Sequence, residues 1–148
     1  MKILVDSREK LPWSFSIYGW EEERKKLLTG DYIIENSDYF VFERKRTCGE
    51  LAINLGTKWK TFHEELKRMQ DYTVPYIVCE FSLECLDTFP IGSGIPEVKW
   101  KYLKMNPFFI KSRLFQYTEK YGIQVLFFNN CQEAQEEVYE IISEKFKR

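Results

Sequence analysis

The sequence predicts an α/β fold in which a mixed β-sheet lies between layers of helices. Short runs rich in β-branched and aromatic residues alternate along the chain with longer segments that carry apolar residues at helical spacing. Turn-forming and helix-capping residues separate these segments. The 148 residues, 44% of them hydrophobic and 17% aromatic, suffice for one packed core, so we expect residues 1–148 to form a single domain.

The first half of the chain predicts one strand, one helix and a hairpin. Residues 3–5 are an apolar run that is typical of a buried strand. Residues 21–28 are charged on one side and predict a helix. Residues 32–34 and 39–45 are rich in aromatic and β-branched residues and flank the polar turn at 36–38, which predicts a β-hairpin.

The second half of the chain begins with a helix, a strand and a loop. Residues 60–72 carry apolar side chains every three or four positions, which predicts an amphipathic helix. Residues 76–80 form another apolar run and predict a buried strand. Glycine and proline recur through residues 81–96, so we expect this segment to be a loop.

The C-terminal part predicts two helices around one strand. Asn106-Pro107 favours a helix start with proline in the first turn, and Gly122 marks the end of that helix. Residues 123–128 then predict a strand. Asn130 is expected to cap the last helix, with Glu133 placed for a capping-box-like arrangement.

Composition narrows the functional classes. No apolar run approaches the roughly 20 residues that a membrane-spanning helix needs, and the apolar stretch at the N-terminus is too short for a signal-peptide core. We therefore expect a soluble intracellular protein without a membrane partner, cytoplasmic in a prokaryotic or viral setting and cytoplasmic or nuclear in a eukaryote. The four cysteines lack a CxxC pair or a histidine at ligand spacing, which argues against a zinc site.

The net charge of −1 argues against nonspecific coating of nucleic acid, because such binding depends on many phosphate contacts. Basic residues nevertheless gather locally. They outnumber acidic residues between Arg44 and Arg68, and a second basic stretch runs from Lys99 to Arg113. A protein that contacts nucleic acid through a limited surface is therefore compatible with the overall charge.

One group of charged residues is placed for chemistry. Four Glu-x-Lys triplets occur, but only Glu43-Arg44-Lys45 ends a predicted strand. Side chains alternate along a strand, so Glu43 and Lys45 share one face and Arg44 points to the other. Asp31 opens the preceding strand of the hairpin, and its carboxylate can approach Glu43. From spacing alone, a salt bridge on an edge strand explains these residues as well as a catalytic site does.

The catalytic interpretation has a clear physical basis. Two adjacent carboxylates repel each other and are well satisfied by a hard divalent cation such as Mg²⁺. In phosphodiester hydrolysis such an ion would polarise the phosphate and help to generate hydroxide. The ammonium group of Lys45 would orient the attacking water or offset charge in the transition state.

Three short motifs follow one another along the chain; they are Val5-Asp6-Ser7-Arg8-Glu9, Leu28-Thr29-Gly30-Asp31-Tyr32 and Glu43-Arg44-Lys45. In this order they resemble the XPF family of structure-specific endonucleases, which belongs to the restriction-endonuclease-like PD-(D/E)XK superfamily. Further similar positions are Phe62, Arg68-Met69, Tyr72, Ser112 and the segment 121–134, so the resemblance covers nearly the whole chain.

This resemblance implies a restriction-endonuclease-like three-layer α/β/α sandwich with a central mixed β-sheet. It also implies a Mg²⁺-dependent DNA endonuclease, with Mn²⁺ able to substitute, that acts in repair or recombination on branched DNA or on junctions between single-stranded and double-stranded DNA. Asp31 and Glu43 match the metal-binding carboxylates and Lys45 the catalytic lysine. Asp6 matches an additional acidic ligand, and Arg8 is expected to contact a phosphate.

Other matched positions have open roles. Glu9 either lines the site or forms a local ion pair with the arginine before it. Arg44 points away from the metal face and is expected to brace the fold, and Arg68 either reaches the site or is an exposed helical arginine. The family usually has an aspartate where this chain has Gly49, with the next acid at Glu50, so a role for Glu50 in the site is uncertain.

The resemblance also raises the question of how DNA is held. The family commonly carries tandem helix-hairpin-helix motifs after the nuclease domain, and these 148 residues have none. We expect DNA binding to depend on a partner subunit, on a homodimer or on a surface of the chain itself. Family nuclease domains pair through a helical face, for which the candidates here are Phe108, Phe109, Phe115 and Tyr117.

Two alternatives remain. A Holliday-junction resolvase or a restriction-type nuclease would use the same fold and chemistry. A non-catalytic DNA-binding or scaffolding subunit would keep the fold without the chemistry. The presence of Asp31, Glu43 and Lys45 together favours an active enzyme, because a scaffold has no need of them.

Overall fold

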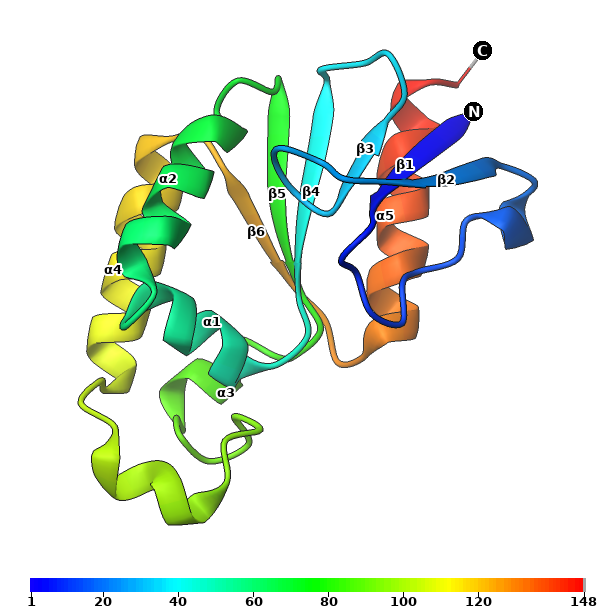
Figure 1. Cartoon of the computed structure of the whole chain (residues 1–148). Coiled ribbons are helices and arrows are strands. Elements are labelled where there is room, and N and C mark those ends of the chain that lie inside the picture. Colours follow the sequence, from blue (N-terminus) through cyan, green and yellow to red (C-terminus); the bar gives the residue numbers. More distant parts are fainter. Residues whose placement is uncertain (148) are drawn as a thin grey trace.

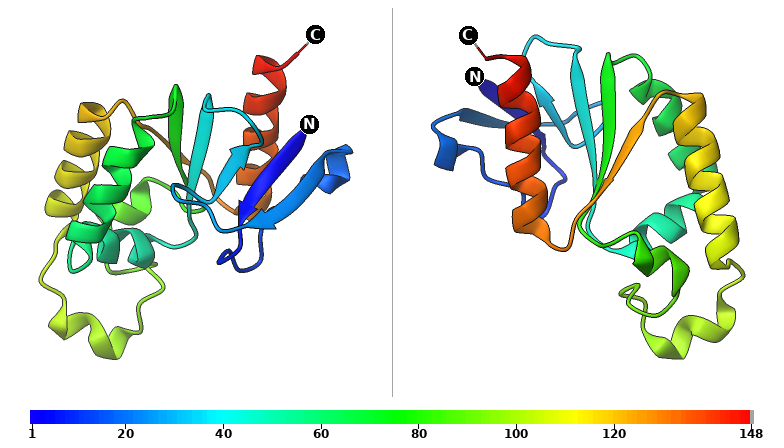
Figure 2. Two further views of the ribbon diagram at one scale, coloured as in Figure 1. Left: turned by 45° about the horizontal axis from the view of Figure 1, so that its top comes forward. Right: turned by 180° about the vertical axis from the view of Figure 1, so that it is seen from behind.

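The computed structural model describes residues 1–147 and confirms the three-layer α/β fold. A six-stranded mixed sheet is covered by helices on both faces (Figures 1 and 2). The strands are β1 (Lys2–Asp6), β2 (Glu21–Lys25), β3 (Tyr32–Ile34), β4 (Phe40–Lys45), β5 (Val74–Cys79) and β6 (Gln124–Phe127). The helices are α1 (Cys48–Leu55), α2 (Trp59–Met69), α3 (Glu84–Asp87), α4 (Pro107–Lys120) and α5 (Cys131–Lys145), with 3₁₀ helices at Ser16–Tyr18 and Glu97–Tyr102.

The strands lie in the order β2-β1-β3-β4-β5-β6. The predicted hairpin is confirmed, since β3 and β4 pair antiparallel with Tyr32 opposite Phe42 and Ile33 opposite Val41. Strand β3 also pairs antiparallel with β1, whereas β1–β2, β4–β5 and β5–β6 are parallel pairs. This mixed sheet places the start of β3 beside the end of β4, so Asp31 and Glu43 lie at the same end of the hairpin.

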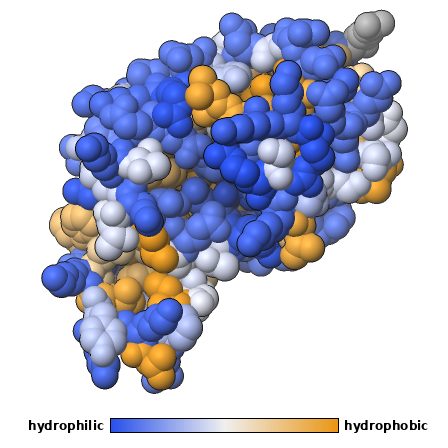
Figure 3. Space-filling model, in the orientation of Figure 1, coloured by the Kyte–Doolittle hydropathy of each residue, from blue (hydrophilic) through white to orange (hydrophobic). Residues whose placement is uncertain are grey.

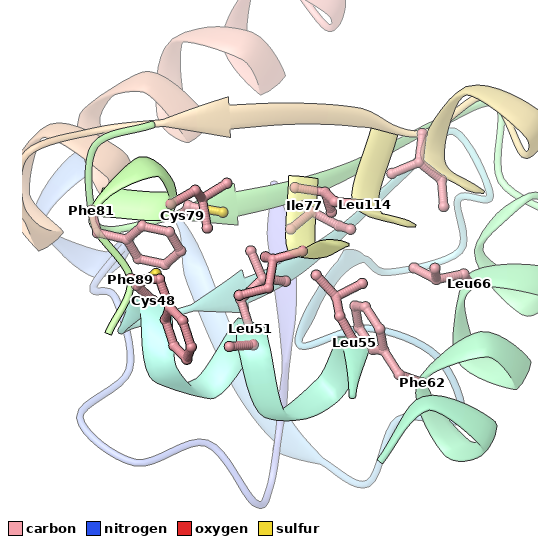
Figure 4. Packing of buried hydrophobic residues seen from close by; sticks show 14 of the residues in the cluster. Cys48, Leu51, Leu55, Phe62, Leu66, Ile77, Cys79, Phe81, Phe89 and Leu114 are labelled. Carbon is pink, nitrogen blue, oxygen red and sulfur yellow. The ribbon is translucent and has the colours of Figure 1, made fainter. Parts of the chain in front are cut away.

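Alternation along β4 separates two hydrophobic cores. Val41 points to the face covered by α1, α2 and α4, where it packs with residues such as Leu51 and Leu66. Figure 4 shows how the apolar side chains of these helices meet the strands. Phe40 and Phe42 point to the other face, which α5 and the segment before β2 cover. Successive side chains of β4 therefore point alternately into the two cores.

The helices expected from apolar spacing and caps are confirmed. Helix α2 buries Phe62, Leu66 and Met69, the side chains that set its period. Helix α4 begins after Asn106, whose Oδ1 accepts from Phe109 N at 2.9 Å. In α5, Asn130 Oδ1 accepts from Glu133 N, and Glu133 Oε2 in turn accepts from Asn129 N, so the capping arrangement is reciprocal.

The helix predicted for residues 21–28 is wrong. Residues Glu21–Lys25 form the edge strand β2, which pairs in parallel with β1 and leaves all five side chains exposed. The strand is held by tertiary contacts: Glu22 Oε1 accepts from the backbone N–H groups of Phe15 and Ser16, and Lys2 Nζ lies 3.1 Å from Glu23 Oε1. Pairing with β1 thus outweighs the helical preference of a glutamate and lysine run.

Two further segments differ from expectation. Helix α1 was not predicted; it starts at the N-cap Thr47, whose Oγ1 accepts from Glu50 N at 3.1 Å. The loop expected at residues 81–96 contains the short helix α3, and the chain then forms the 3₁₀ helix Glu97–Tyr102. Over residues 1–147, none of the helices is both long and apolar enough to cross a bilayer.

Candidate active site

Glu43 and Lys45 lie on one face of β4, as their spacing predicts, and both side chains are buried. Lys45 Nζ is 3.8 Å from Glu43 Oε1 and 4.8 Å from the centre of the Phe62 ring. Only 5% of each residue is exposed. Glu43 Oε2 has no hydrogen-bond donor among the described residues. Burying a carboxylate oxygen without a hydrogen-bond donor costs free energy, so this oxygen is a candidate ligand for a bound cation or other group.

Asp31 is brought to Glu43 by the turn that precedes β3. Its backbone N–H donates to Phe42 O at 2.8 Å, and its Oδ2 accepts from Arg44 N at 2.8 Å. The turn needs Gly30, which has φ of +73° and lies so close to β4 that an added Cβ would be 2.3 Å from Val41 Cγ2. The order Thr-Gly-Asp therefore positions the carboxylate against the end of β4.

A third carboxyl group, that of Glu65 on α2, was missed by the sequence analysis. Glu65 lies against Glu43 closely enough for the two side chains to share a hydrogen bond. It belongs to a Glu-x-Lys triplet that looks like solvated helical charge. A signal was nevertheless present: Glu65 lies three residues after the buried Phe62 and one before the buried Leu66, so it borders the face of α2 that packs on the sheet.

Burial and mutual repulsion set the charges of this site. Burial raises the pKa of Glu43 well above its usual range, and burial also raises the pKa of Asp31. Burial opposes ionisation of Glu65 as well, but the hydrogen bond with Glu43 and the charge of Lys45 outweigh it, so the pKa of Glu65 is lowered. The two carboxyl groups thus shift in opposite directions, with the pKa of Glu43 raised and that of Glu65 lowered.

Lys45 stays charged in this setting. Burial alone would lower its pKa, but the charges of Glu43 and Glu50, followed by those of Glu65 and Asp31, outweigh burial and raise the pKa. A lysine held in its ammonium form donates hydrogen bonds and stabilises negative charge. It is therefore suited to a substrate anion and not to abstracting a proton.

Asp6 and Arg8 lie next to these residues. The backbone N–H of Asp6 donates to Asp31 O at 2.8 Å. Both carboxylate oxygens of Asp6 are engaged, with Arg8 Nε 2.9 Å from Oδ2 and Leu27 N 3.0 Å from Oδ1. Arg8 is largely exposed. The hydrogen bond with Asp6 is the main cause of its raised pKa, and the charges of the nearby Asp31 and Glu65 add to it. Its guanidinium is thus available at the rim of the site.

Arg44 points to the opposite face and uses all five of its side-chain donors. It makes a two-pronged ion pair with Glu80, at 2.8 and 3.1 Å. The remaining donors reach Glu9 Oε2, Leu11 O and Cys131 Sγ. Glu9 also accepts from the Tyr32 hydroxyl, and its charge adds to the burial that raises the pKa of Asp31. The geometry of Arg44 is that of a brace between the sheet, the N-terminal segment and α5.

The departure at Gly49 has a structural reason. Gly49 N donates to Ser93 O at 2.7 Å, and a Cβ at this position would lie 2.5 Å from that oxygen and 2.8 Å from Ile95 Cγ1. A larger residue cannot fit unless the loop moves. Glu50, one position later, places Oε1 3.7 Å from Lys45 Nζ, so an acid does reach the lysine from the first turn of α1.

Arg68 lies one turn beyond Glu65 on α2. Burial raises the pKa of Glu65, and the charge of Arg68 helps to lower it, after the hydrogen bond with Glu43, the charge of Lys45 and the backbone N–H of Gly30. Arg68 Nε is buried and has no acceptor among the described residues. Arg68 therefore borders the site and keeps one donor free for a ligand.

The site fits a divalent metal held partly by substrate and water. Within residues 1–147, no three histidine, cysteine, aspartate or glutamate side chains are arranged to hold a metal by themselves. Mg²⁺ sites in phosphoryl-transfer enzymes commonly use only one or two carboxylates and take their other ligands from water and phosphate. The unpartnered Glu43 Oε2 beside Asp31 meets that requirement.

Comparison with known proteins gives one family match. The family model described as the ERCC4 domain matches residues 5–141, which include every residue of the site described above. No curated protein matches the sequence.

Two solved structures are similar in fold. The first is XPF from Aeropyrum pernix, with a TM-score of 0.71 and 20% sequence identity. The match covers 100% of this chain and 66% of that one, so this chain spans about two thirds of that structure's length. The second is XPF from Aeropyrum pernix in complex with DNA, with a TM-score of 0.64 and 19% identity over 99% of this chain and 67% of that one.

Proposed function

Because the chain belongs to the ERCC4 domain family, we propose that it is a metal-dependent DNA endonuclease that hydrolyses phosphodiester bonds in branched DNA. The observation that carries this proposal is the buried cluster of Asp31, Glu43 and Lys45, in which Glu43 Oε2 lacks a donor. A cluster kept only for stability would satisfy that oxygen. An oxygen left free beside a charged lysine is instead suited to binding a cation and a phosphate together.

Asp31 and Glu43 would hold Mg²⁺, or Mn²⁺ in its place, and the ion would supply a Lewis acid for the phosphate and an activated water. Lys45 would stabilise the charge that develops on the phosphate oxygens, since it is held as an ammonium ion. Arg8 and Arg68 would bind phosphate at the rim. Asp6 stays a predicted metal ligand, and it would have to release Arg8 or Leu27 to act as one.

DNA is the proposed substrate, and a structural neighbour is a complex with DNA. Branched DNA or a junction between single-stranded and double-stranded segments is proposed from the family resemblance. Repair or recombination is the corresponding cellular setting. The basic residues that border the acidic cluster, among them Arg8 and Arg68, provide the positive charge that a phosphate backbone requires.

The direct test is cleavage by the purified protein. Splayed-arm, flap and four-way DNA are incubated with Mg²⁺, Mn²⁺ or a chelator. We expect metal-dependent incision that Asp31→Ala and Glu43→Ala each abolish, while Glu64→Ala, a change at an exposed residue of α2, leaves it intact. Equal cleavage by both site variants would exclude this assignment.

The same assay separates the alternatives. Preferential cutting of four-way DNA would favour a Holliday-junction resolvase, and sequence-dependent cutting of linear duplex would favour a restriction-type nuclease. Binding without incision under any metal would favour the non-catalytic DNA-binding or scaffolding subunit. The free oxygen of Glu43 favours the active enzyme over that last alternative.

Pairing of two copies, or with a partner subunit, is proposed from the resemblance. Among the four aromatic residues expected at such a face, Phe108 and Phe115 are exposed on α4. Phe109 and Tyr117 are partly buried, with Arg113 over the Phe109 ring and Trp59 against Tyr117. We expect Phe108 and Phe115 to carry any contact. Sedimentation at micromolar concentration, with Phe108→Ser/Phe115→Ser as the comparison, tests it.

A further inference from the structure

A projection between β5 and α4 reaches past the ends of α1 and α3. It comprises residues 90–105 and is visible in yellow-green in Figures 1 and 2. The Gly49–Ser93 hydrogen bond ties it to the first turn of α1. Within it, Trp100 Nε1 donates to Ile95 O at 3.0 Å. These contacts give the projection a defined position relative to the candidate active site.

The projection and the helix after it are basic. From Val98 through Thr118 the chain has no acidic residue. Lys111 is paired with Asp87 and Arg113 donates to Leu55 O, so these two charges are already engaged. The three lysines of the projection are exposed and form no ion pair within residues 1–147; they are Lys99, Lys101 and Lys104.

An aromatic ring stands among these lysines. Tyr102 is 71% exposed, and Lys101 Nζ lies 5.1 Å from the centre of its ring. Figure 3 shows hydrophobic and hydrophilic side chains mixed over the projection, unlike the mainly hydrophilic face above it. Exposed aromatic rings interleaved with basic residues are the combination by which proteins bind single-stranded nucleic acid, since bases stack on the rings and phosphates meet the charges.

A groove lies between the projection and α1 and has a volume of about 720 Å³. Glu50 is one of its lining residues, and Glu50 Oε1 is 3.7 Å from Lys45 Nζ of the candidate active site. The residues that line it include Thr47, Glu50 and Ile53 from α1 and Ile95, Lys99 and Tyr102 from the projection.

We propose that this groove and the projection bind the unpaired strand of the DNA substrate, with a base stacked on Tyr102 and phosphates held by Lys99, Lys101 and Lys104. This inference rests on the proposed function and adds to it a site for single-stranded DNA. Because Glu50 lines the groove and lies 3.7 Å from Lys45 Nζ, a strand bound there would run close to the candidate active site. The enzyme would thereby distinguish a junction from continuous duplex by a surface of its own chain.

The test is equilibrium binding with chelator present, so that no strand is cut. Fluorescence anisotropy is measured with a splayed-arm DNA, a duplex of equal length and a single strand. We expect Tyr102→Ala to weaken binding of splayed-arm and single-stranded DNA by about five-fold or more and of duplex by less than about two-fold. Tyr102→Phe keeps the ring and should restore binding.

The lysines are tested by salt dependence. Lys99→Ala/Lys101→Ala/Lys104→Ala should lower the slope of log affinity against log salt for single-stranded DNA by about two units, because about 0.7 is lost for each phosphate contact. The triple change Lys120→Ala/Lys145→Ala/Lys147→Ala removes the same net charge elsewhere and should leave the slope nearly unchanged. Thermal unfolding checks that each variant is folded.

The outcomes are distinct. If the unchanged protein binds none of these DNAs, the proposed function and this inference both fail. If it binds and cuts splayed-arm DNA, and Tyr102→Ala does so equally well, only the inference fails. If Tyr102→Ala alters sedimentation and leaves DNA affinity unchanged, the projection is a protein-binding surface and the inference is also overturned.

Discussion

The two faces of β4 carry buried ionisable residues that differ in how completely they are hydrogen-bonded. On one face the Arg44 guanidinium has an acceptor for each of its five N–H groups. On the other face Glu43 has an oxygen with no donor, although the side chain is equally buried. A saturated buried ion holds the structure together, whereas an unsaturated one keeps a binding capacity in reserve. Under the proposed function, Arg44 would serve stability and its neighbour Glu43 the chemistry.

The largest effect is expected from Arg44→Met. Removing the guanidinium leaves Glu80 and Glu9 buried without their cation, which should lower the free energy of unfolding by about 3–5 kcal/mol. Denaturant unfolding measures the loss. Lys111→Met, at the exposed ion pair with Asp87, is the control and should cost less than about 1 kcal/mol. A stable Arg44→Met protein without nuclease activity would instead place Arg44 in the site.

Lys45→Met should lower the rate of DNA cleavage about 10²- to 10³-fold, because a fixed positive charge at the reacting phosphate is lost. Calorimetric titration with Mn²⁺ should show metal affinity retained, since Asp31 and Glu43 remain. Lys67→Met, at an exposed pair on α2, should leave the cleavage rate unchanged. Loss of metal affinity together with turnover would make Lys45 a structural member of the cluster.

Gly49→Asp introduces the acid that the family resemblance implies at this position and should destabilise the protein by about 1–3 kcal/mol. The added Cβ would lie 2.5 Å from Ser93 O, so the loop must shift. Thermal unfolding gives the size of the loss, and Glu50→Ala is the neighbouring control without a steric clash. Unchanged stability together with faster cleavage would show that the loop yields and that the acid is useful.

The smallest expected effect is a pH-dependent gain in the free energy of unfolding from Glu43→Gln. The raised pKa means that folded Glu43 keeps its proton at pH values where the unfolded chain has lost it. The metal-free protein therefore loses stability as pH rises above the ordinary pKa of a glutamate. At pH 8, Glu43→Gln should stabilise it by about 1 kcal/mol or more, since one pKa unit corresponds to about 1.4 kcal/mol. The gain should vanish below about pH 4.

Urea unfolding at several pH values with chelator measures this dependence. Glu64→Gln, at an exposed glutamate on the same helix as Glu65, is the control and should show no comparable change with pH. If Glu43→Gln destabilises the protein at pH 8, then Glu43 is satisfied in solution and the contrast between the two faces of β4 is wrong.

Much of the fold was predictable because it depends on local patterns. The caps of α4 and α5 and the period of α2 lie within a few residues of sequence, and the structure confirms them. Strand β2 was missed because nothing within Glu21–Lys25 specifies its pairing; the ladder with β1 does. Local preference predicts an element only where distant contacts do not outweigh it.

The residues of the candidate site likewise differ in whether local sequence or distant packing brings them together. Asp31 and Glu43 were predictable as neighbours because one hairpin joins them. Glu65 was not predictable, since only the packing of α2 on the sheet brings it to Glu43. Likewise, the ion pair of Arg44 with Glu80 joins β4 to the residue that follows β5, and the sequence does not reveal the register of these two parallel strands.

The two edges of the sheet differ in a way that bears on assembly. At one edge, all five side chains of β2 are exposed and each carries a charge, which opposes the addition of another strand. At the other edge, Val125, Leu126 and Phe127 of β6 are only partly buried. Any edge-to-edge addition of a strand from another copy would therefore have to use β6. A sheet that offers a single edge for pairing can join two copies but cannot extend into an open-ended polymer.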